Sequence, residues 1–278
     1  MMTDSRKTPR VSAIITTYNE EEFIRTAVES ILEQTISDFE IVVVDDGSKD
    51  STKNILKEYE RLDKMRIFFL EHIGRSPALN EAIDRSRGKY IAIVDPDDLS
   101  RNNRFKRQAD FLDNNPDVGI VGSAYRAENE IRSESYVREY PTSDTEIRRA
   151  MAKYIPIPHS SMMARREALV RAGLYDSTKQ FIVDLDLMIR VATQYKMANI
   201  PEPLITRKIR SESSFHSMFS SFDRQLQLFK LNNKAVRILD LPTYRYLYSF
   251  GHLLYHYLPN RIKKWTRQLF SGLDEKHK

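Results

Sequence analysis

The sequence of 278 residues contains no cysteine. This absence excludes disulfide bonds, zinc–thiolate sites and thiol nucleophiles, and it is compatible with a reducing compartment. No apolar run approaches the length of about 20 residues that spans a membrane, and the polar start up to Arg10 lacks the pattern of a secretory signal. We therefore expect a cytoplasmic protein, either free or peripheral at the cytoplasmic face of a membrane.

The excess of positive over negative charge is also small. The sequence has 44 basic and 39 acidic residues, which gives a formal net charge of only +5. This excess suits phosphate-bearing substrates or an anionic membrane surface, and we predict no nucleic-acid partner. Two glycine-rich motifs are missing as well, the dinucleotide-binding fingerprint and the Walker phosphate loop. A nucleotide would therefore have to be held through carboxylates and a metal ion.

The first hundred residues alternate between short apolar runs and amphipathic segments of helical spacing. One of the predicted helices begins in the segment 74–77, which contains a glycine and a proline. Ser76 is a plausible N-cap of this helix, and Pro77 stands in its first turn. The order βαβαβαβ predicts a parallel sheet with helices on both faces. The expected strands are 11–17, 41–44, 66–70 and 90–94, and the helices lie between them, the first over 21–34.

The second half of the chain is less regular. Helices are expected over 102–114, 142–154 and 167–171 and from 181 onward, with strands over 118–122 and 159–163. Helical spacing resumes from Phe215.

The fourth apolar run leads directly into a cluster of acids. Tyr90–Val94 is followed by Asp95, Asp97 and Asp98, and Pro96 marks the end of the strand. Three carboxylates so close together repel one another unless a cation neutralises them. Mg²⁺ and Mn²⁺ prefer oxygen ligands, so the cluster is a candidate metal site. The alternative is a polar turn in which Asp98 caps the following helix.

Polar side chains also follow the other predicted strands. The carboxyl ends of parallel strands meet at one edge of the sheet, so one crevice is expected to collect them. They are Thr17 and Asn19 after the first strand, Asp45 and Asp46 after the second, and the acid cluster after the fourth.

Two further acids stand at the predicted start of the helix near residue 183. An Asp at that position is commonly a cap favoured by the helix dipole. This structural explanation fits one of Asp184 and Asp186 and does not need both.

Tyrosines and basic residues accumulate in the last forty residues, as in Tyr244–Tyr248. In the predicted helix Ile262–Phe270, the apolar residues Ile262, Trp265 and Leu269 share one face. This composition suits a helix lying on a membrane surface. A helix packed on its own domain is the alternative.

Five segments together resemble the family-two glycosyltransferases, which have the GT-A fold. That family's opening strand and helix are similar to VSAIITTYNEEEFIRTAVESILEQT, its acidic nucleotide turn to FEIVVVDDGSKDST, and its DxD strand with the preceding helix to GRSPALNEAIDRSRGKYIAIVDPDD. Its acceptor-side strand resembles HSSMMARREAL, and its segment with the catalytic base resembles VDLDLMIRV. The match covers residues 10–210, with the motifs in the family's order.

The resemblance implies a Rossmann-like α/β domain with a mostly parallel central sheet flanked by helices. That domain would occupy residues 1–212, with a nucleotide-binding half over 10–100 and an acceptor half over 101–212. A C-terminal helical extension would occupy 213–278.

The implied reaction moves a sugar, with inversion, from a nucleotide-diphosphate-sugar donor to a glycan or lipid-linked acceptor. A UDP-sugar is the favoured donor. Mn²⁺ or Mg²⁺ held by Asp97 and Asp98 would neutralise the charge that develops on the leaving nucleoside diphosphate. Asp184 falls at the position of the general base, which accepts the proton of the acceptor hydroxyl.

The resemblance also assigns the residues that bind the substrates. The end of the first strand and the acid turn would contact the base and ribose, Arg75 would reach the nucleotide, and His159 would contact the diphosphate or the acceptor. The full set is Thr17, Tyr18, Asn19, Glu20, Asp46, Arg75, Asp95, Asp97 and His159.

Two positions depart from the family pattern. Val183 stands where the family often has Glu, so the acid before Asp184 is missing. The segment Arg207–Ser211 stands where the family often has a histidine, so a histidine metal ligand is not expected there, although Arg210 could pair with phosphates.

Two other functions are compatible with a similar sheet. A sugar nucleotidyltransferase needs an early glycine-rich loop with a basic residue, and Thr16–Glu20 has no glycine. A binding module that has lost activity is the second alternative, and the presence of Asp97, Asp98 and Asp184 argues against it.

Overall fold

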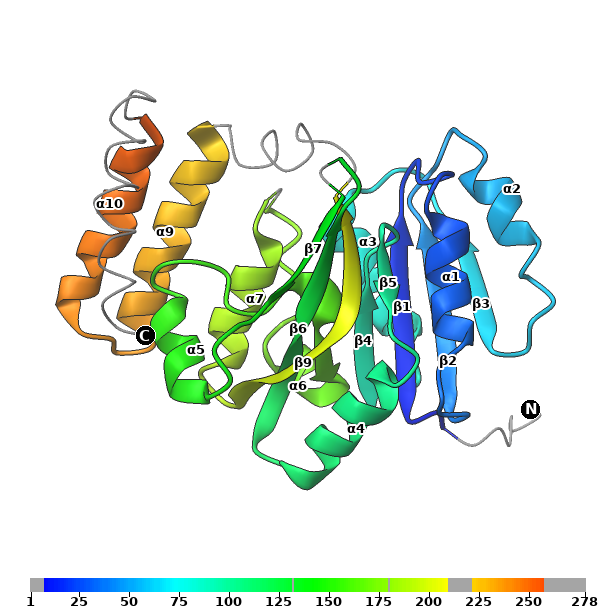
Figure 1. Cartoon of the computed structure of the whole chain (residues 1–278), viewed down its shortest axis with the longest axis horizontal. Helices are drawn as coiled ribbons and strands as arrows, with labels where there is room; N and C mark the ends of the chain where they lie inside the picture. Colours follow the sequence, from blue (N-terminus) through cyan, green and yellow to red (C-terminus); the bar gives the residue numbers. More distant parts are fainter. Residues whose placement is uncertain (1–7, 132, 180, 210–221, 258–278) are drawn as a thin grey trace.

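The structure, a computed structural model, describes residues 8–131, 133–179, 181–209 and 222–257. Its first half confirms the predicted alternation of strands and helices (Figure 1). Four strands pair in parallel in the order β3-β2-β1-β4. These strands are β1 (Val11–Thr17), β2 (Phe39–Asp45), β3 (Met65–Phe69) and β4 (Tyr90–Val94), and the helices between them are α1 (Ile24–Leu32), α2 (Thr52–Lys57) and α3 (Arg75–Arg85).

The sheet separates two apolar cores, because alternate side chains of each strand point to opposite faces. On one face, Val11, Ala13 and Ile15 pack in a cluster with residues of α1, α2 and α4 (Arg104–Asn114). On the other face, Ile14 and Val42 pack with α3, α6 (Arg166–Arg171) and α7 (Val183–Val191). The predicted helices on both faces of a mostly parallel sheet are confirmed.

The second half adds the mixed part of the sheet, in the order β4-β8-β6-β9-β5. β8 (Met163–Arg165) lies antiparallel between β4 and β6 (Val118–Asn129), and β7 (Glu134–Arg138) forms a hairpin with β6. β9 (Lys196–Ile209) runs parallel to β6 and antiparallel to β5 (Asp98–Ser100). Helix α5 (Asp144–Ala150) lies inside the predicted range 142–154.

The strand expected over 159–163 is wrong for its first four residues. His159–Ser161 form a short 3₁₀ helix, η1, and the strand begins only at Met163. The hydroxyl of Ser161 donates to the carbonyl of Pro158. Such a local hydrogen bond offers the backbone an alternative to a strand ladder.

Two helix starts also differ from expectation. Helix α3 has Gly74 at its N-cap with a left-handed φ of 93°, so Ser76 lies inside the first turn and is not the cap. Helix α7 has Ile182 at its N-cap, also left-handed at φ 53°, so neither Asp184 nor Asp186 is the N-cap residue.

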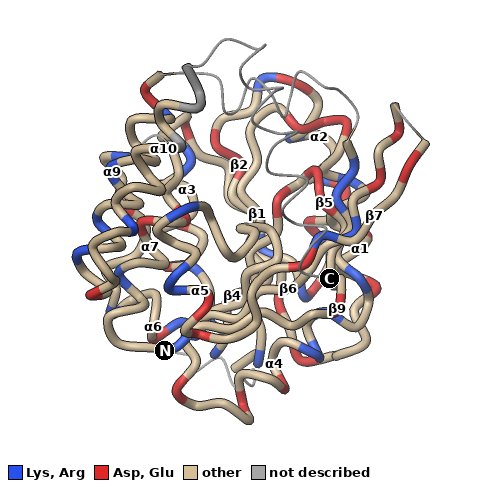
Figure 2. Tube along the Cα trace, turned by 60° about the vertical axis from the view of Figure 1, so that its left-hand side comes forward, with Lys and Arg blue, Asp and Glu red and all other residues tan. Residues whose placement is uncertain are grey.

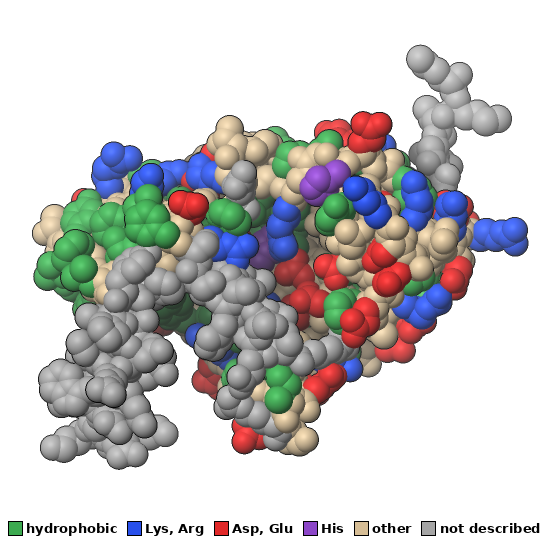
Figure 3. All heavy atoms as spheres, turned by 90° about the horizontal axis from the view of Figure 1, so that it is seen from above, with side chains coloured by type: hydrophobic (Ala, Val, Ile, Leu, Met, Phe, Trp, Pro, Cys, Tyr) green, Lys and Arg blue, Asp and Glu red, His purple; other side chains and the backbone are tan. Residues whose placement is uncertain are grey.

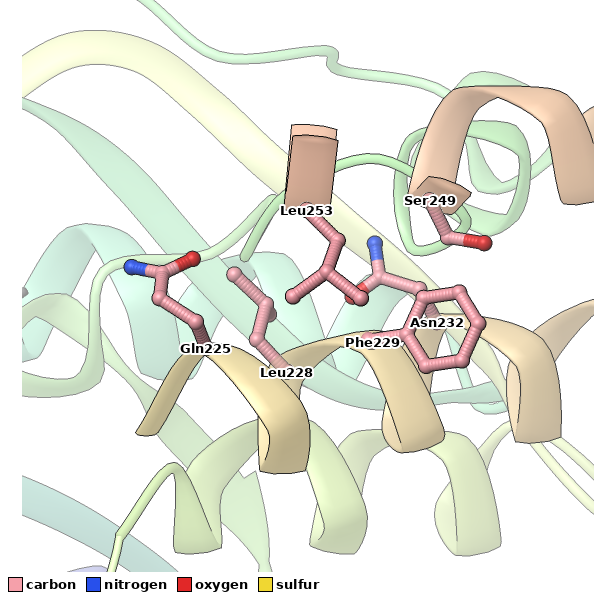
Figure 4. Close-up of a pocket in the computed structure, with 6 residues that line it drawn as sticks. All are labelled: Gln225, Leu228, Phe229, Asn232, Ser249 and Leu253. Carbon is pink, nitrogen blue, oxygen red and sulfur yellow. The ribbon is translucent and has the colours of Figure 1, made fainter. Parts of the chain in front are cut away.

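Two helices follow the sheet and pack against each other, α9 (Phe222–Ile238) and α10 (Tyr246–Tyr257), with the 3₁₀ turn η2 (Thr243–Arg245) between them. Leu228, Leu231 and Ala235 of α9 belong to the same core as α7. The seam between the two helices is filled by side chains, with Leu253 of α10 above Leu228 (Figure 4).

No helix within the described residues is long and apolar enough to cross a bilayer. The predicted helix Ile262–Phe270 lies outside the described residues, as do Arg210 and the expected domain boundary at residues 212–213.

Candidate active site

The acid cluster lies at the carboxyl end of β4, as predicted. Asp95, Asp97 and Asp98 each offer an oxygen within 4.8 Å of the others. Asp98 begins β5, where it stands opposite Arg207 of β9. The helix-capping alternative for Asp98 is wrong, because α4 begins six residues later with Asn103 at its N-cap.

Arginines flank the cluster on both sides. Arg75 Nη2 lies 3.0 Å from Asp95 Oδ1, and Arg207 Nη2 lies 3.3 Å from Asp98 Oδ2. Burial alone would raise the pKa of Asp95, but the charge of Arg75 and the contact with His159 outweigh it, so that this pKa lies well below its ordinary value. Asp95 is therefore ionised at every physiological pH.

Two neighbouring carboxyl groups show the opposite shift. Burial and the charges of Asp98 and Asp95 raise the pKa of Asp97 to about 6. Burial, then the charges of Asp97 and Asp95, raise the pKa of Glu20 to about 7. The crevice therefore carries more negative charge than its arginines neutralise.

This set of donors fits a hard divalent cation. Carboxylate oxygens are the ligands that Mg²⁺ and Mn²⁺ prefer, and Asp95, Asp97 and Asp98 bring three of them together. The raised pKa of Asp97 is the expected sign of a site whose charge is incompletely compensated.

A second cluster joins Arg75 to η1. His159, only 8% exposed, places Nδ1 3.2 Å from Arg75 Nη2 and Nε2 2.9 Å from the Tyr175 hydroxyl. The same Nδ1 lies 3.5 Å from Asp95 Oδ1. His159 therefore lies between the acid cluster and Tyr175.

Asp184 lies in the first turn of α7, half-buried, where its Oδ1 accepts a hydrogen bond from the Leu185 N–H at 2.8 Å. The pKa of Arg75 is raised by the charge of Asp95 and, against the effect of burial, by Asp184 and Tyr175. Asp184 is therefore near enough to Arg75 and Tyr175 for its charge to act on both.

The part of the site that is predicted to bind the nucleotide lies at the carboxyl ends of β1 and β2. Both oxygens of the buried Asp46 accept backbone hydrogen bonds, Oδ1 from Ile73 at 2.7 Å and Oδ2 from Gly74 at 3.0 Å. This carboxylate therefore ties β2 to the start of α3. Within the described residues, the buried Thr17 Oγ1 and Asp45 Oδ2 have no hydrogen-bond partner.

The turn after β1 lies against the acid turn after β2. Asn19 has a left-handed φ of 57°, its N–H donates to Ser48 Oγ at 2.9 Å, and its Oδ1 accepts from Lys49 N–H at 2.7 Å. The Tyr18 ring stacks at 4.3 Å on the ring of His72 and is 39% exposed. An exposed aromatic pair thus borders the crevice.

Two further views show where acidic and basic residues gather. Seen from above, acidic side chains occupy a hollow in the middle of the face, with histidine and basic side chains at its edge (Figure 3). Acidic and basic stretches lie next to each other around β5 (Figure 2). Contacts among their side chains bring the acid cluster, Arg75 and His159 together.

A model of glycosyl transferase family 2 matches residues 12–173. The chain belongs to this family. Among its relatives, this family 2 glycosyltransferase is 34% identical over 218 residues to the uncharacterized glycosyltransferase MJ1057 of Methanocaldococcus jannaschii, covering 75% of this chain and 74% of the relative. It is 28% identical over 267 residues to the putative glycosyltransferase EpsE of Bacillus subtilis, covering 91% of each chain.

Solved structures support the GT-A fold of the glycosyltransferase. The mannosyltransferase PcManGT of Pyrobaculum calidifontis, in complex with GDP-Man and Mn²⁺, superposes with a TM-score of 0.68 at 22% identity, covering 89% of this chain and 73% of that one. TarS of S. aureus, in complex with UDP-GlcNAc, gives 0.66 at 18% identity, covering 88% and 70%.

Three residues of the glycosyltransferase contact predicted site residues, and the sequence had not predicted these contacts. Tyr175 bonds His159, His72 lies 3.0 Å from Asp46, and Arg207 contacts both Asp98 and Ser160 Oγ. Only Arg207 had a signal in the sequence, as the departure from the family's histidine. Each of these contacts joins residues that are sixteen or more positions apart, so local patterns could not reveal them.

Proposed function

We propose that this glycosyltransferase transfers a sugar from a nucleoside-diphosphate sugar to a glycan or lipid-linked acceptor, with inversion at the anomeric carbon. The observation that carries the proposal is that Arg75, which pairs with Asp95 of the acid cluster, also lies within the electrostatic influence of Asp184. An inverting displacement needs a base on one side of the reacting carbon and charge stabilisation for the leaving group on the other. The crevice provides both kinds of group.

The donor would lie along the strand ends. Asp46 fixes the loop before α3, and Thr17, Tyr18 and Asn19 surround the space at the end of β1, where the base and ribose would bind. The unpaired oxygens of Thr17 and Asp45 are acceptors that a uracil or ribose donor group could satisfy. TarS has been solved with UDP-GlcNAc and PcManGT with GDP-Man, which supports a nucleotide-sugar donor. We favour a UDP-sugar.

The diphosphate would lie between Arg75 and the acid cluster. Asp97 and Asp98, with Asp95 beside them, would hold Mn²⁺ or Mg²⁺, which supplies electrostatic stabilisation to the leaving phosphate oxygens when bound. Arg75, whose side chain is 55% exposed, can turn a donor group toward the phosphates. Glu20 and Asp97 stay partly protonated until a cation compensates them, which keeps repulsion low beforehand.

The acceptor would approach from the side of η1 and α7. Asp184 would accept the hydroxyl proton as the oxygen attacks the anomeric carbon. His159, whose Nε2 contacts the Tyr175 hydroxyl, presents its other nitrogen to Arg75 and so orients that guanidinium. EpsE and the amylovoran biosynthesis glycosyltransferase AmsE of Erwinia amylovora are relatives, and the latter name supports a polysaccharide acceptor.

Two measurements test the function. Incubation with a panel of sugar nucleotides should release the nucleoside diphosphate from one donor, and calorimetry should show tight UDP or GDP binding with Mn²⁺ and weak binding with excess chelator. Binding without turnover on any donor would favour an inactive binding module. Formation of a sugar nucleotide from a sugar phosphate and a nucleoside triphosphate would instead identify a nucleotidyltransferase. Equal nucleotide affinity with and without chelator would refute the metal role of Asp97 and Asp98.

A further inference from the structure

One face of α9 contacts the segment that leads into α7. The Arg224 guanidinium lies 4.4 Å from the centre of the Phe181 ring, and Gln227 Nε2 donates to the Phe181 carbonyl. Lys234 Nζ lies 2.7 Å from Asp186 Oδ1. Because positions three and seven residues apart share one side of a helix, these three side chains form one continuous contact face.

The contacted segment contains an unusual backbone conformation. Ile182 has φ 53° and ψ 38°, in the left-handed region. A β-branched residue rarely adopts this conformation, which persists only where the surroundings fix it. The α9 contacts stand on both sides of it, at Phe181 before and at Asp186 after.

Of the two residues of this segment that α9 contacts, Phe181 and Asp186, Asp186 is held more strongly. Its side chain is 1% exposed and lies 2.9 Å from Arg190 Nε, 2.7 Å from Lys234 and 3.7 Å from Lys179. A buried carboxylate that loses a partner is strongly unfavourable. Lys234 therefore fixes the first turn of α7, in which Asp184 also lies, against α9.

We propose that α9 positions the candidate base, with its side chains holding segment 181–186 so that the Asp184 carboxylate faces the acid crevice. This inference rests on the proposed role of Asp184. Arg224, Gln227 and Lys234 act through the backbone of α7 and are positioning residues. Helix α9 would then be part of the catalytic apparatus.

The first test replaces Lys234 by Met, which keeps length and removes charge. We expect kcat to fall by about tenfold to a hundredfold, because small misplacements of a reacting group cost factors of this order. The donor KM should change little, since the acid cluster is on β4 and β5. Lys234→Arg should restore most of the rate. Lys230→Met, at an exposed position of the same helix, is the matched control and should leave the rate unchanged.

A double-mutant cycle separates positioning from general loss of structure. If Lys234 acts through the base, Lys234→Met should lower turnover far less in an Asp184→Asn background than in the parent. An equal fold-loss in both backgrounds would overturn the inference. Near-normal transfer by Asp184→Asn alone is a different result, and it would overturn the proposed role of the base instead.

Melting temperatures show whether each variant folds. If Lys234→Met does not fold, Gln227→Met provides the same cycle, because it removes only one neutral hydrogen bond to the Phe181 carbonyl. A folded Gln227→Met that keeps full kcat would likewise overturn the positioning role of α9. A lowered kcat that disappears in the Asp184→Asn background would support it.

Discussion

Asp184 and Asp186 are two residues apart on α7 but lie in opposite surroundings. Asp186 is buried between Lys234 and Arg190, and these hydrogen bonds and charges lower its pKa in spite of burial. Asp184 is half-buried, accepts one backbone hydrogen bond from Leu185, and its charge acts on Arg75. Their position at a helix start did not distinguish the two acids, and it was the family resemblance that assigned the base to Asp184. The contacts of Asp186 with Lys234 and Arg190 agree with a structural role for Asp186.

We predict that Asp184→Asn lowers sugar transfer by about a hundredfold to ten-thousandfold, the usual contribution of a general base. Asn keeps the size and hydrogen-bonding shape of the side chain but no longer accepts a proton. Nucleotide affinity and melting temperature should change little. Donor binding by calorimetry and transfer with the preferred donor measure this, and a variant with near-parental transfer would rule out the base.

The raised pKa values of Asp97 and Glu20 have a consequence for stability. Both groups bind protons more tightly in the folded protein than in the unfolded chain, where carboxyl pKa values are about 4. Between about pH 4 and pH 7, the metal-free folded state therefore holds more protons, and the stability that these groups contribute falls as the pH rises.

We predict that Asp97→Asn raises the melting temperature of the metal-free protein at pH 7.5 and has little effect at pH 5, where Asp97 is largely protonated. The gain should be about 1 kcal/mol, because the exposure of Asp97 screens its repulsion. Mn²⁺ should stabilise the parent and not the variant. Thermal unfolding at both pH values, with and without Mn²⁺, measures this. A variant less stable than the parent at pH 7.5 would contradict it.

At the level of elements, a buried arginine holds the turn that carries the candidate metal ligands. Arg104, fully buried at the start of α4, donates to Gln108 Oε1, to Ser100 Oγ and to the Ile93 carbonyl. It thereby joins β4, β5 and α4. Burial lowers the pKa of its guanidinium to about 10, against the charges of Asp98 and Asp95. The sequence pattern of residues 102–114 predicted the helix but gave no sign that this arginine is internal.

Arg104→Met should lower the free energy of unfolding by about 2 kcal/mol or more, because it leaves buried oxygens without donors. The matched control is Arg107→Met, which removes only an exposed ion pair with Glu202 and should cost at most about 1 kcal/mol. Denaturant unfolding of the two variants compares them. Mn²⁺-dependent nucleotide binding should weaken in Arg104→Met alone, and equal destabilisation of both variants would contradict this account.

The elements that the sequence failed to predict share a physical reason. β9 contains Pro201 and Pro203, which usually argue against a strand, and its pairing with β6 is irregular beside Pro203. β5 is only three residues long and is fixed by its partner β9. Their pairing is set by tertiary contacts, whereas the parallel strands carry continuous apolar runs of their own.

At the level of the whole molecule, the convergence of the site was predictable and its internal contacts were not. Parallel strands bring their carboxyl ends to one edge, so Thr17, Asp46 and Asp95 were expected there from topology alone. Whether Asp46 bonds a ligand or the loop at Gly74, and which arginine neutralises Asp98, depend on distant side chains. Only the three-dimensional structure reveals these contacts.

The outermost helix leaves an apolar face exposed. Leu247 is 70% exposed, and Phe250 and Leu254 are each 52% exposed, at the spacing of one helix face. Hydrophobic side chains cover this end of the molecule in Figure 3. Tyr244, 53% exposed, stands beside Arg245, so aromatic and basic groups border the apolar face. Such a combination is typical of a surface that lies on a membrane.

We predict that this face binds anionic membranes. Residues 258–278 add Arg261, Lys263, Lys264, Arg267, Lys276 and Lys278 against Asp274 and Glu275. Each basic residue near such a surface contributes about 1 kcal/mol. Binding should therefore weaken with salt, while the apolar face supplies a part that salt does not remove.

The test replaces Leu247, Phe250 and Leu254 together by Ser and measures co-sedimentation with anionic liposomes. The control replaces Tyr136 and Val137 by Ser, because these residues of β7 are similarly exposed, at 49% and 44%, far along the chain from α10. The α10 variant should lose most binding at high salt, and the β7 variant should bind like the parent. Equal binding by all three would mean that the apolar face has another occupant, such as a second copy of the chain. Sedimentation velocity of the parent and the α10 variant would then show whether that copy is present.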